Sequence, residues 1–136
     1  MKNASEIMYK IGRIINIIVI PLSAFLLVLG IILAAAGTVG AGSANTEEQQ
    51  AAIAMAASGG SLIGYGSFLL VTSILSLVIC TKKKAEIDNG SNEIAPRVLL
   101  IVFGAIAENV FYILAGIFSL VARSQEMNNT NNNVQE

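Results

Sequence analysis

Three long apolar segments, almost free of charged side chains, constrain this chain more than any other feature. They cover residues 14–36, 61–81 and 98–122, and Glu108 is the only charged residue inside them. As helices they would be about 30 to 38 Å long, enough to cross a hydrocarbon core of about 30 Å. We therefore predict an all-α integral membrane protein whose three spanning helices form a bundle.

The composition excludes several classes of function. Only 12% of the residues are charged, whereas soluble domains carry about 25%. The chain has no histidine and a single cysteine, Cys80, which excludes His-dependent catalytic pairs, His-ligated metals and an internal disulfide. The formal net charge of −1 gives no sign of a nucleic-acid partner. We predict no enzyme activity, no cofactor and no bound metal.

The basic residues predict the orientation of the helices. Three of them precede the first span and four lie between the second and third, whereas the first loop has none and the tail has only Arg123. The positive-inside rule then places the N-terminus and the second loop in the cytoplasm, and the C-terminus outside. We expect a multi-pass protein of a bacterial plasma membrane.

We predict a single membrane domain over residues 1–126 and a disordered, Asn-rich tail over residues 127–136. Outside the spans, a helix is expected to begin near Thr46 and to break at Gly59-Gly60. The first span could instead be a signal peptide that is cleaved within residues 34–44. Cleavage would leave a two-helix hairpin with a cytoplasmic loop.

Read as one helix, the third apolar segment has a small, polar face and a large aliphatic face. The first face covers an arc of about 140° and contains Gly104, Ala105, Glu108, Asn109, Tyr112, Ala115, Gly116 and Ser119. Small residues let helix backbones approach closely, while large aliphatic side chains meet lipid. This pattern predicts that Glu108 points into protein and that Gly104 and Gly116 mediate helix packing.

The second apolar segment carries two stripes of small residues on nearly opposite sides. One contains Gly60, Gly64 and Ser67, and the other contains Gly66, Ser73, Ser76 and Cys80. Two contact faces suit either the middle helix of a bundle or a helix with one face inside and one against a partner chain.

Glu108 is predicted to belong to a polar layer near the middle of the membrane. The candidate members, which share roughly one depth, are Ser23, Thr72, Ser73, Asn109 and, one turn further, Tyr112. Because no Lys, Arg or His lies in any span, the chain offers Glu108 no counter-ion, and burial would favour the protonated form. Three roles follow for Glu108: a neutral hydrogen-bond donor, a proton- or cation-binding carboxylate, or a partner for a basic residue of another subunit.

We expect a small membrane protein that acts through helix–helix contacts, as an accessory or oligomerising subunit. Its partners would be the lipid bilayer and further copies of the chain or a larger membrane complex. The alternative is a component of a proton- or cation-coupled transporter or pore that uses Glu108 in an oligomer. The segment Gly104–Tyr112 resembles the proton-carrying helix of rotary ATPase ring subunits, in which a glutamate precedes a tyrosine by about one turn.

Overall fold

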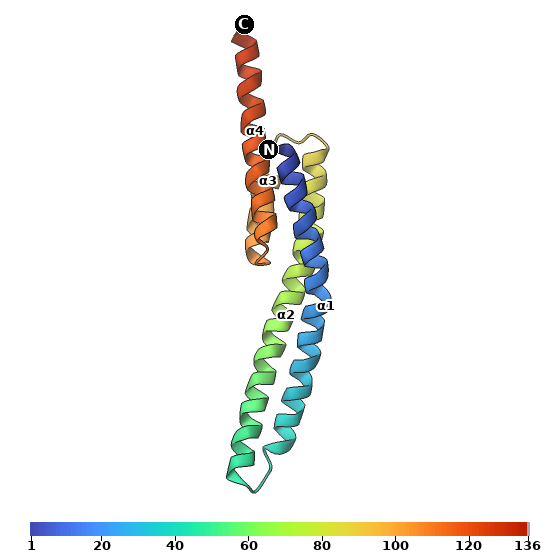
Figure 1. Ribbon diagram of the computed structural model, residues 1–136, viewed down its shortest axis with the longest axis vertical. Helices are drawn as coiled ribbons and strands as arrows, with labels where there is room; N and C mark the ends of the chain where they lie inside the picture. The colour runs from blue at the N-terminus through green and yellow to red at the C-terminus, as the bar shows by residue number, and fades with distance from the viewer. Residues whose placement is uncertain (136) are drawn as a thin grey trace. The chain divides into compact units, whose positions relative to one another are not determined.

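The computed structural model describes residues 1–135, which form four α-helices and no strands (Figure 1). The helices are α1 (Lys2–Gly40), α2 (Thr46–Asp88), α3 (Ala95–Ile106) and α4 (Val110–Gln135). The chain divides into two compact units. Unit 1 consists of Met1–Ile17 and the chain from Thr72 onward, and unit 2 consists of Ile18–Val71. The all-α prediction is confirmed.

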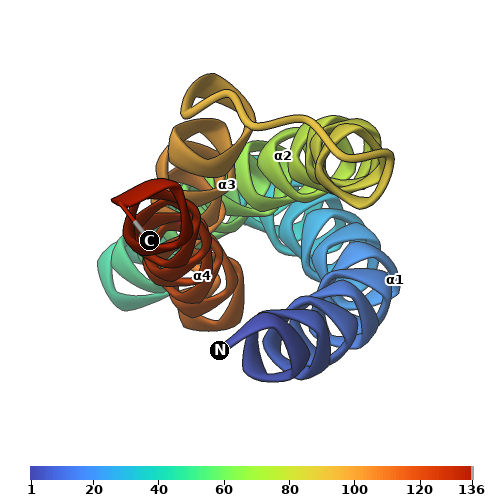
Figure 2. The same ribbon diagram turned by 90° about the horizontal axis from the view of Figure 1, so that it is seen from above.

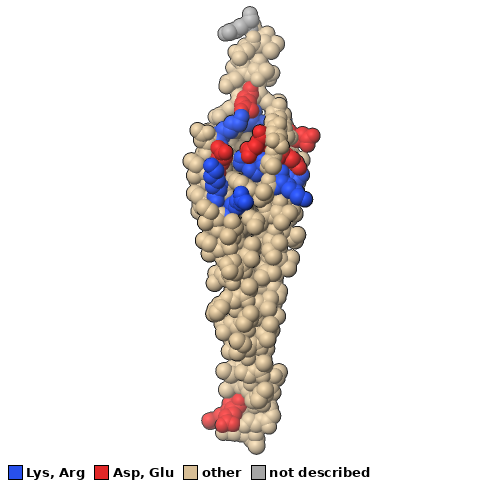
Figure 3. Space-filling model, turned by 90° about the vertical axis from the view of Figure 1, so that its right-hand side faces the viewer, with Lys and Arg blue, Asp and Glu red and all other residues tan. Residues whose placement is uncertain are grey.

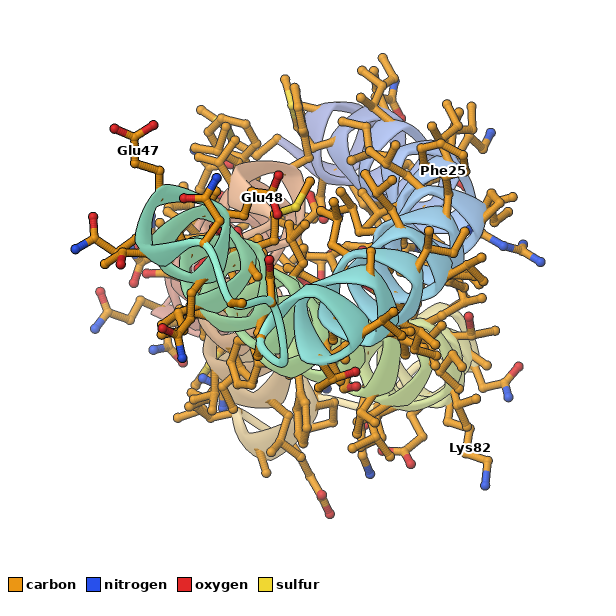
Figure 4. The ribbon with its side chains drawn as sticks, turned by 90° about the horizontal axis from the view of Figure 1, so that it is seen from below. Phe25, Glu47, Glu48 and Lys82 are labelled. Atoms are coloured by element: carbon orange, nitrogen blue, oxygen red, sulfur yellow. The ribbon has the colours of Figure 1, made fainter. Side chains whose placement is uncertain are left out.

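Two helices, α1 and α2, are long and apolar enough to cross a membrane. Only 11% of the residues in the most apolar stretch of α1 are buried, and 22% in that of α2. Large side chains such as Phe25, which is 63% exposed, point away from the helices (Figure 4). A water-soluble protein rarely exposes so much contiguous apolar surface, whereas lipid would cover it.

The third predicted span is not a single helix. α3 and α4 form a helical hairpin and lie side by side (Figures 1 and 2). With 12 residues, α3 is about 18 Å long, which is too short to cross a bilayer. The predicted bundle of three spanning helices is therefore not confirmed: residues 1–135 contain two long apolar helices and the α3–α4 hairpin.

Hydrogen bonds at the end of α3 explain why the chain turns here. The Asn109 N–H donates to the Gly104 carbonyl at 2.8 Å, and the Glu108 N–H donates to the Ala105 carbonyl at 3.2 Å. This pattern is a Schellman motif, which ends a helix with one residue in the left-handed conformation. Glu108 is that residue, with φ of 54°. Asn109 then begins the next helix, because its Oδ1 accepts a hydrogen bond from the Phe111 N–H at 3.2 Å.

The hairpin brings the later part of α4 back to the end of unit 1 that contains the N-terminus. Lys2 pairs with Glu126 at 3.0 Å, and Arg123 donates to the carbonyl of Asn92 in the α2–α3 loop. A tail on the opposite side from the N-terminus does not fit this arrangement. The predicted placement of the C-terminus is therefore not confirmed, because the chain reverses at Glu108, where a third crossing was expected.

Two local expectations also differ from the structure. α2 continues through Gly59 and Gly60 without a break, and residues 127–135, predicted to be disordered, continue α4. At Gly59 the helix is held by packing: a Cβ built there would lie 2.4 Å from the Ala34 nitrogen of α1. Such close backbone contact offsets the low helix propensity of glycine.

Unit 2 is an antiparallel pair of helical segments packed through small residues. A Cβ built at Gly37 would lie 2.5 Å from the Ala56 nitrogen, and one built at Gly30 would lie 2.8 Å from the Ile63 nitrogen. The boundary between the units falls in α1 after Ile17. Pro21 lies four residues later and has no N–H to donate to the Ile17 carbonyl.

Replacing Glu108 with glycine distinguishes a hairpin from a continuous helix by the sign of its effect. In the left-handed position of the hairpin, Glu108→Gly removes strain and should stabilise the protein by about 1 kcal/mol. In the interior of a continuous helix, the same change would destabilise it by about 1 kcal/mol. Unfolding in mixed detergent micelles, followed by circular dichroism, measures the difference. Glu108→Val should destabilise the hairpin, since a β-branched residue resists positive φ.

Candidate functional site

A buried polar network joins the tip of the α3–α4 hairpin to α1. The side-chain nitrogen of Asn109 donates to the Gly12 carbonyl at 2.8 Å and to Asn16 Oδ1 at 3.3 Å. Asn109 is 3% exposed and Asn16 is 1% exposed. An irregular backbone turn is tolerated at membrane depth only where protein satisfies its polar groups. Asn109 does this while also capping α4.

The same network continues into α2. Asn16 Nδ2 donates to the Ser73 carbonyl at 3.3 Å, and the Ser76 hydroxyl donates to the Phe103 carbonyl at 2.9 Å. The Phe103 carbonyl, near the C-terminus of α3, also accepts the Ala107 N–H at 3.0 Å, so the second bond adds a tie from α2 to the end of this helix. Side chains from α1 and α2, together with Asn109 in the turn, thus hold the tip of the hairpin in place.

Aromatic and small residues pack α4 against α1 beside this network. The Tyr9 and Tyr112 rings are stacked with centroids 5.8 Å apart, and the Tyr9 hydroxyl donates to Thr81 Oγ1 at 3.1 Å. A Cβ added to Gly12 would lie 2.8 Å from the Tyr112 ring. The Ser5 hydroxyl donates to the Ala115 carbonyl at 2.8 Å. Tyr112 is fully buried, and its hydroxyl has no hydrogen-bond partner among the described residues.

Glu108 occupies a different position from the one that helical phase predicts. Its side chain is exposed, and no hydrogen bond or ion pair to it occurs within residues 1–135. Its neighbour Asn109 contacts Gly12 and Asn16, so Glu108 lies near the level of α1 at which the apolar run begins. The prediction that Glu108 points into protein is wrong, because it assumes one continuous helix. The positive φ of Glu108 ends α3, so this side chain no longer follows the face that helical periodicity assigns to it.

The predicted polar layer is divided between the two units. Asn109, Tyr112, Thr72 and Ser73 are buried in unit 1. Ser23 is fully buried in unit 2, where its hydroxyl donates to the Val19 carbonyl of its own helix at 2.6 Å.

Asn16 of α1 bonds to Asn109 and to the Ser73 carbonyl of α2. It is absent from the predicted polar layer. Its signal is present in the sequence, since it is an amide within the run Ile14-Ile15-Asn16-Ile17-Ile18. A polar side chain in such a run needs a partner inside the membrane. The predicted layer included only residues near the middle of each span, and Asn16 lies near the start of the first span.

The predicted packing glycines fall into two groups. Gly104 and Gly116 lie between α3 and α4, since a Cβ at Gly104 would be 2.8 Å from the Ile113 nitrogen and one at Gly116 would be 2.9 Å from the Arg97 carbonyl oxygen. Gly60 and Gly64 are exposed, with nothing within 4 Å of an added Cβ. The opposite stripe of α2, formed by Gly66, Ser73, Ser76 and Cys80, is buried.

Removing the Asn109 amide should have the largest effect on the hairpin. Asn109→Ala loses the cap of α4 and two buried donors, so we expect a loss of about 2 to 4 kcal/mol in the free energy of unfolding. Detergent unfolding of full-length protein measures it. Asn109→Ala and Asn16→Leu should be non-additive, because both remove their shared hydrogen bond. Full additivity would contradict the network, and Glu108→Gln serves as the exposed control.

The arrangement offers hydrogen bonding and packing in place of a catalytic constellation. The chain has no histidine, and the described residues contain no group of three or more side chains able to hold a metal ion. What the site can do is fix a helical hairpin against two apolar helices. No protein-family model, curated protein or solved structure matches this chain.

Proposed function

We propose that the chain is an integral membrane protein that acts through helix–helix contacts, as an accessory or oligomerising subunit without catalytic activity of its own. The observation that carries this proposal is the open face of α2 at Gly60 and Gly64. Both residues lie in the apolar part of α2, and space remains open where a side chain would be.

The other glycines make this open face unusual. The chain has ten glycines within helices, and at eight of them an added Cβ would meet another part of the chain within 4 Å. Of these ten helical glycines, only Gly60 and Gly64 meet nothing within 4 Å. Glycine in a helix is less favourable than alanine by about 1 kcal/mol. At the eight packed positions close contact offsets this cost, and at Gly60 and Gly64 a contact with another chain would do so.

The residues around the open face are suited to such a contact. Gly60 and Gly64 form a small-xxx-small step, and Ala57 and Ser61 form a parallel exposed step. Such steps let two membrane helices approach closely and exchange van der Waals contacts. Tyr65, which is 50% exposed, borders the steps and provides a larger surface for a second copy of α2.

The charges support a membrane orientation with both termini in the cytoplasm. All eight basic residues belong to unit 1, whereas the only charged residues of unit 2 are Glu47 and Glu48 in the first turn of α2. Figure 3 shows the Lys and Arg side chains gathered in one band, and Figure 4 shows Glu47 directed away from the helices. The positive-inside rule then favours a cytoplasmic N-terminus, α2–α3 loop and tail. The α3–α4 hairpin would enter the membrane from that side and return.

Transport of a proton or cation through Glu108 has less support. Its carboxylate is exposed instead of facing the buried amides, and the described residues contain no group of three or more acids or cysteines that could hold a metal ion. Loss of pH-dependent flux in proteoliposomes of Glu108→Gln would favour transport over an accessory role.

The open face predicts self-association that depends on Gly64. In liposomes, Gly64→Leu should weaken the dimer by about tenfold, since a loss of about 1.4 kcal/mol in contact energy has this effect. Single-molecule photobleaching of labelled protein at known dilution measures the dimer fraction. Ala36→Leu, a small-to-large change at another exposed apolar position, is the matched control. A wild-type protein that stays monomeric at all dilutions would contradict self-association and leave a different membrane subunit as the partner.

Reporter fusions test the proposed orientation. A green fluorescent protein fused after the tail should fluoresce, because it folds well only in the cytoplasm, and an alkaline phosphatase fused there should be inactive. The same reporters inserted at Ser43, between α1 and α2, should give the reverse result. An active phosphatase at the tail would restore the third crossing and contradict the hairpin.

A further inference from the structure

A cavity of about 260 Å³ lies among the charged residues of unit 1. Its walls come from the start of α1, the end of α2, the α2–α3 loop, the start of α3 and the middle of α4. The basic side chains of the lining are Lys2, Lys84, Arg97 and Arg123, and the acidic ones are Glu6, Asp88 and Glu126.

The charges of the lining are unevenly matched. Lys2 pairs with Glu126, and Lys84 pairs with Asp88. Among residues 1–135, Arg97 and Arg123 are the two basic residues of the lining without an ion pair, and Glu6 is the one acid of the lining without an ion pair. The cavity therefore holds two guanidinium groups that have no carboxylate of their own.

Arg97 is the unusual member of this group. It is only 6% exposed, and its Nη1 donates to the carbonyls of Glu93 at 2.6 Å and Ser91 at 3.1 Å. Its Nε is buried and has no hydrogen-bond partner within the described chain. Burying a guanidinium with an unused donor and no anion is costly, and buried charges are normally paired.

The surroundings of Arg97 increase that cost. Burial and the positive charge of Arg123 lower the pKa of the Arg97 guanidinium, and the negative charge of Glu126 raises it. Arg97 also lies in the first turn of α3, where the helix dipole disfavours a cation and favours an anion. An anion between Arg97 and Arg123 would offset these penalties.

We propose that this cavity binds a phosphate group through Arg97 and Arg123. Planar guanidinium groups suit phosphate because they present parallel N–H donors to two oxygens at once. The group could belong to an anionic phospholipid or to free inorganic phosphate. Val98 and Ile7 follow the lining residues Arg97 and Glu6 in the chain, and their apolar side chains, which are 40% and 56% exposed, suit a lipid. The phosphate site does not rest on the proposed membrane role, but the lipid source does.

Binding by full-length, delipidated protein in detergent tests the site. Native mass spectrometry compares adducts of phosphatidylglycerol and phosphatidylcholine, and equilibrium dialysis with radiolabelled inorganic phosphate tests the free ion. We expect phosphatidylglycerol to bind at least about tenfold more tightly than phosphatidylcholine. Arg97→Gln and Arg123→Gln should each weaken this binding by about tenfold, since each removes charged hydrogen bonds.

Matched variants separate the site from general charge effects. Arg13→Gln makes the same substitution at an exposed arginine outside the cavity and should leave binding unchanged. If Arg97→Gln fails to fold, the substitution of Arg123, which is less buried than Arg97, still tests the site. Inorganic phosphate that binds and is lost in the same variants would support the site with a soluble source. If neither phosphatidylglycerol nor inorganic phosphate binds, or if Arg13→Gln and Arg123→Gln weaken binding equally, the proposal is overturned.

Discussion

The hydrogen bonds of Asn109 are the interaction on which the rest of unit 1 depends. An apolar run of this length would ordinarily continue as one helix, because every backbone group is then satisfied within the helix. Turning back inside it exposes carbonyls of α3 and N–H groups of α4. Asn109 supplies its side-chain oxygen to the Phe111 N–H and its nitrogen to Gly12 and Asn16. Without these bonds, the reversal would leave polar groups unsatisfied among apolar side chains.

The reversal also makes the charge distribution easier to understand. If the third run crossed the membrane, Arg123 would be the single basic residue on the outer side. With the hairpin, Arg123 lies near Asn92 and Glu126 lies near Lys2, so the basic residues of the chain gather in one unit. In the three-span reading, Arg123 is an exception to the positive-inside pattern. With the hairpin, Arg123 lies with the other basic residues and no exception remains. With the reversal, the basic residues favour the proposed orientation without an exception.

The sequence indicates the helices and their apolar surfaces better than it indicates where the chain turns. Length and apolar composition suffice to predict α1 and α2, because spanning requires only a long run without charges. The turn depends on two adjacent residues, Glu108 and Asn109, whose types are compatible with either a helix interior or a cap. Choosing between them requires the partners of Asn109, and Gly12 and Asn16 are distant in sequence. Helical phase failed at Glu108 because it assumes an unbroken helix, yet Asn109, Tyr112 and Gly116 are buried as phase predicts.

Glu108 has an exceptional conformation as well as an exceptional charge, and the two have different explanations. The left-handed position that ends α3 is normally filled by glycine, and a glutamate there costs about 1 kcal/mol. The negative charge of its side chain can explain why a glutamate, and not a glycine, occupies this position. At the tip of a hairpin, a carboxylate resists deeper burial, since moving it into hydrocarbon is costly. Glu108 would therefore limit how far the hairpin enters the membrane, in the way that lysines hold helix ends at the interface. In the proposed membrane orientation, Glu108 would set depth, while the buried amides of Asn109 and Asn16 hold the tip of the hairpin against α1.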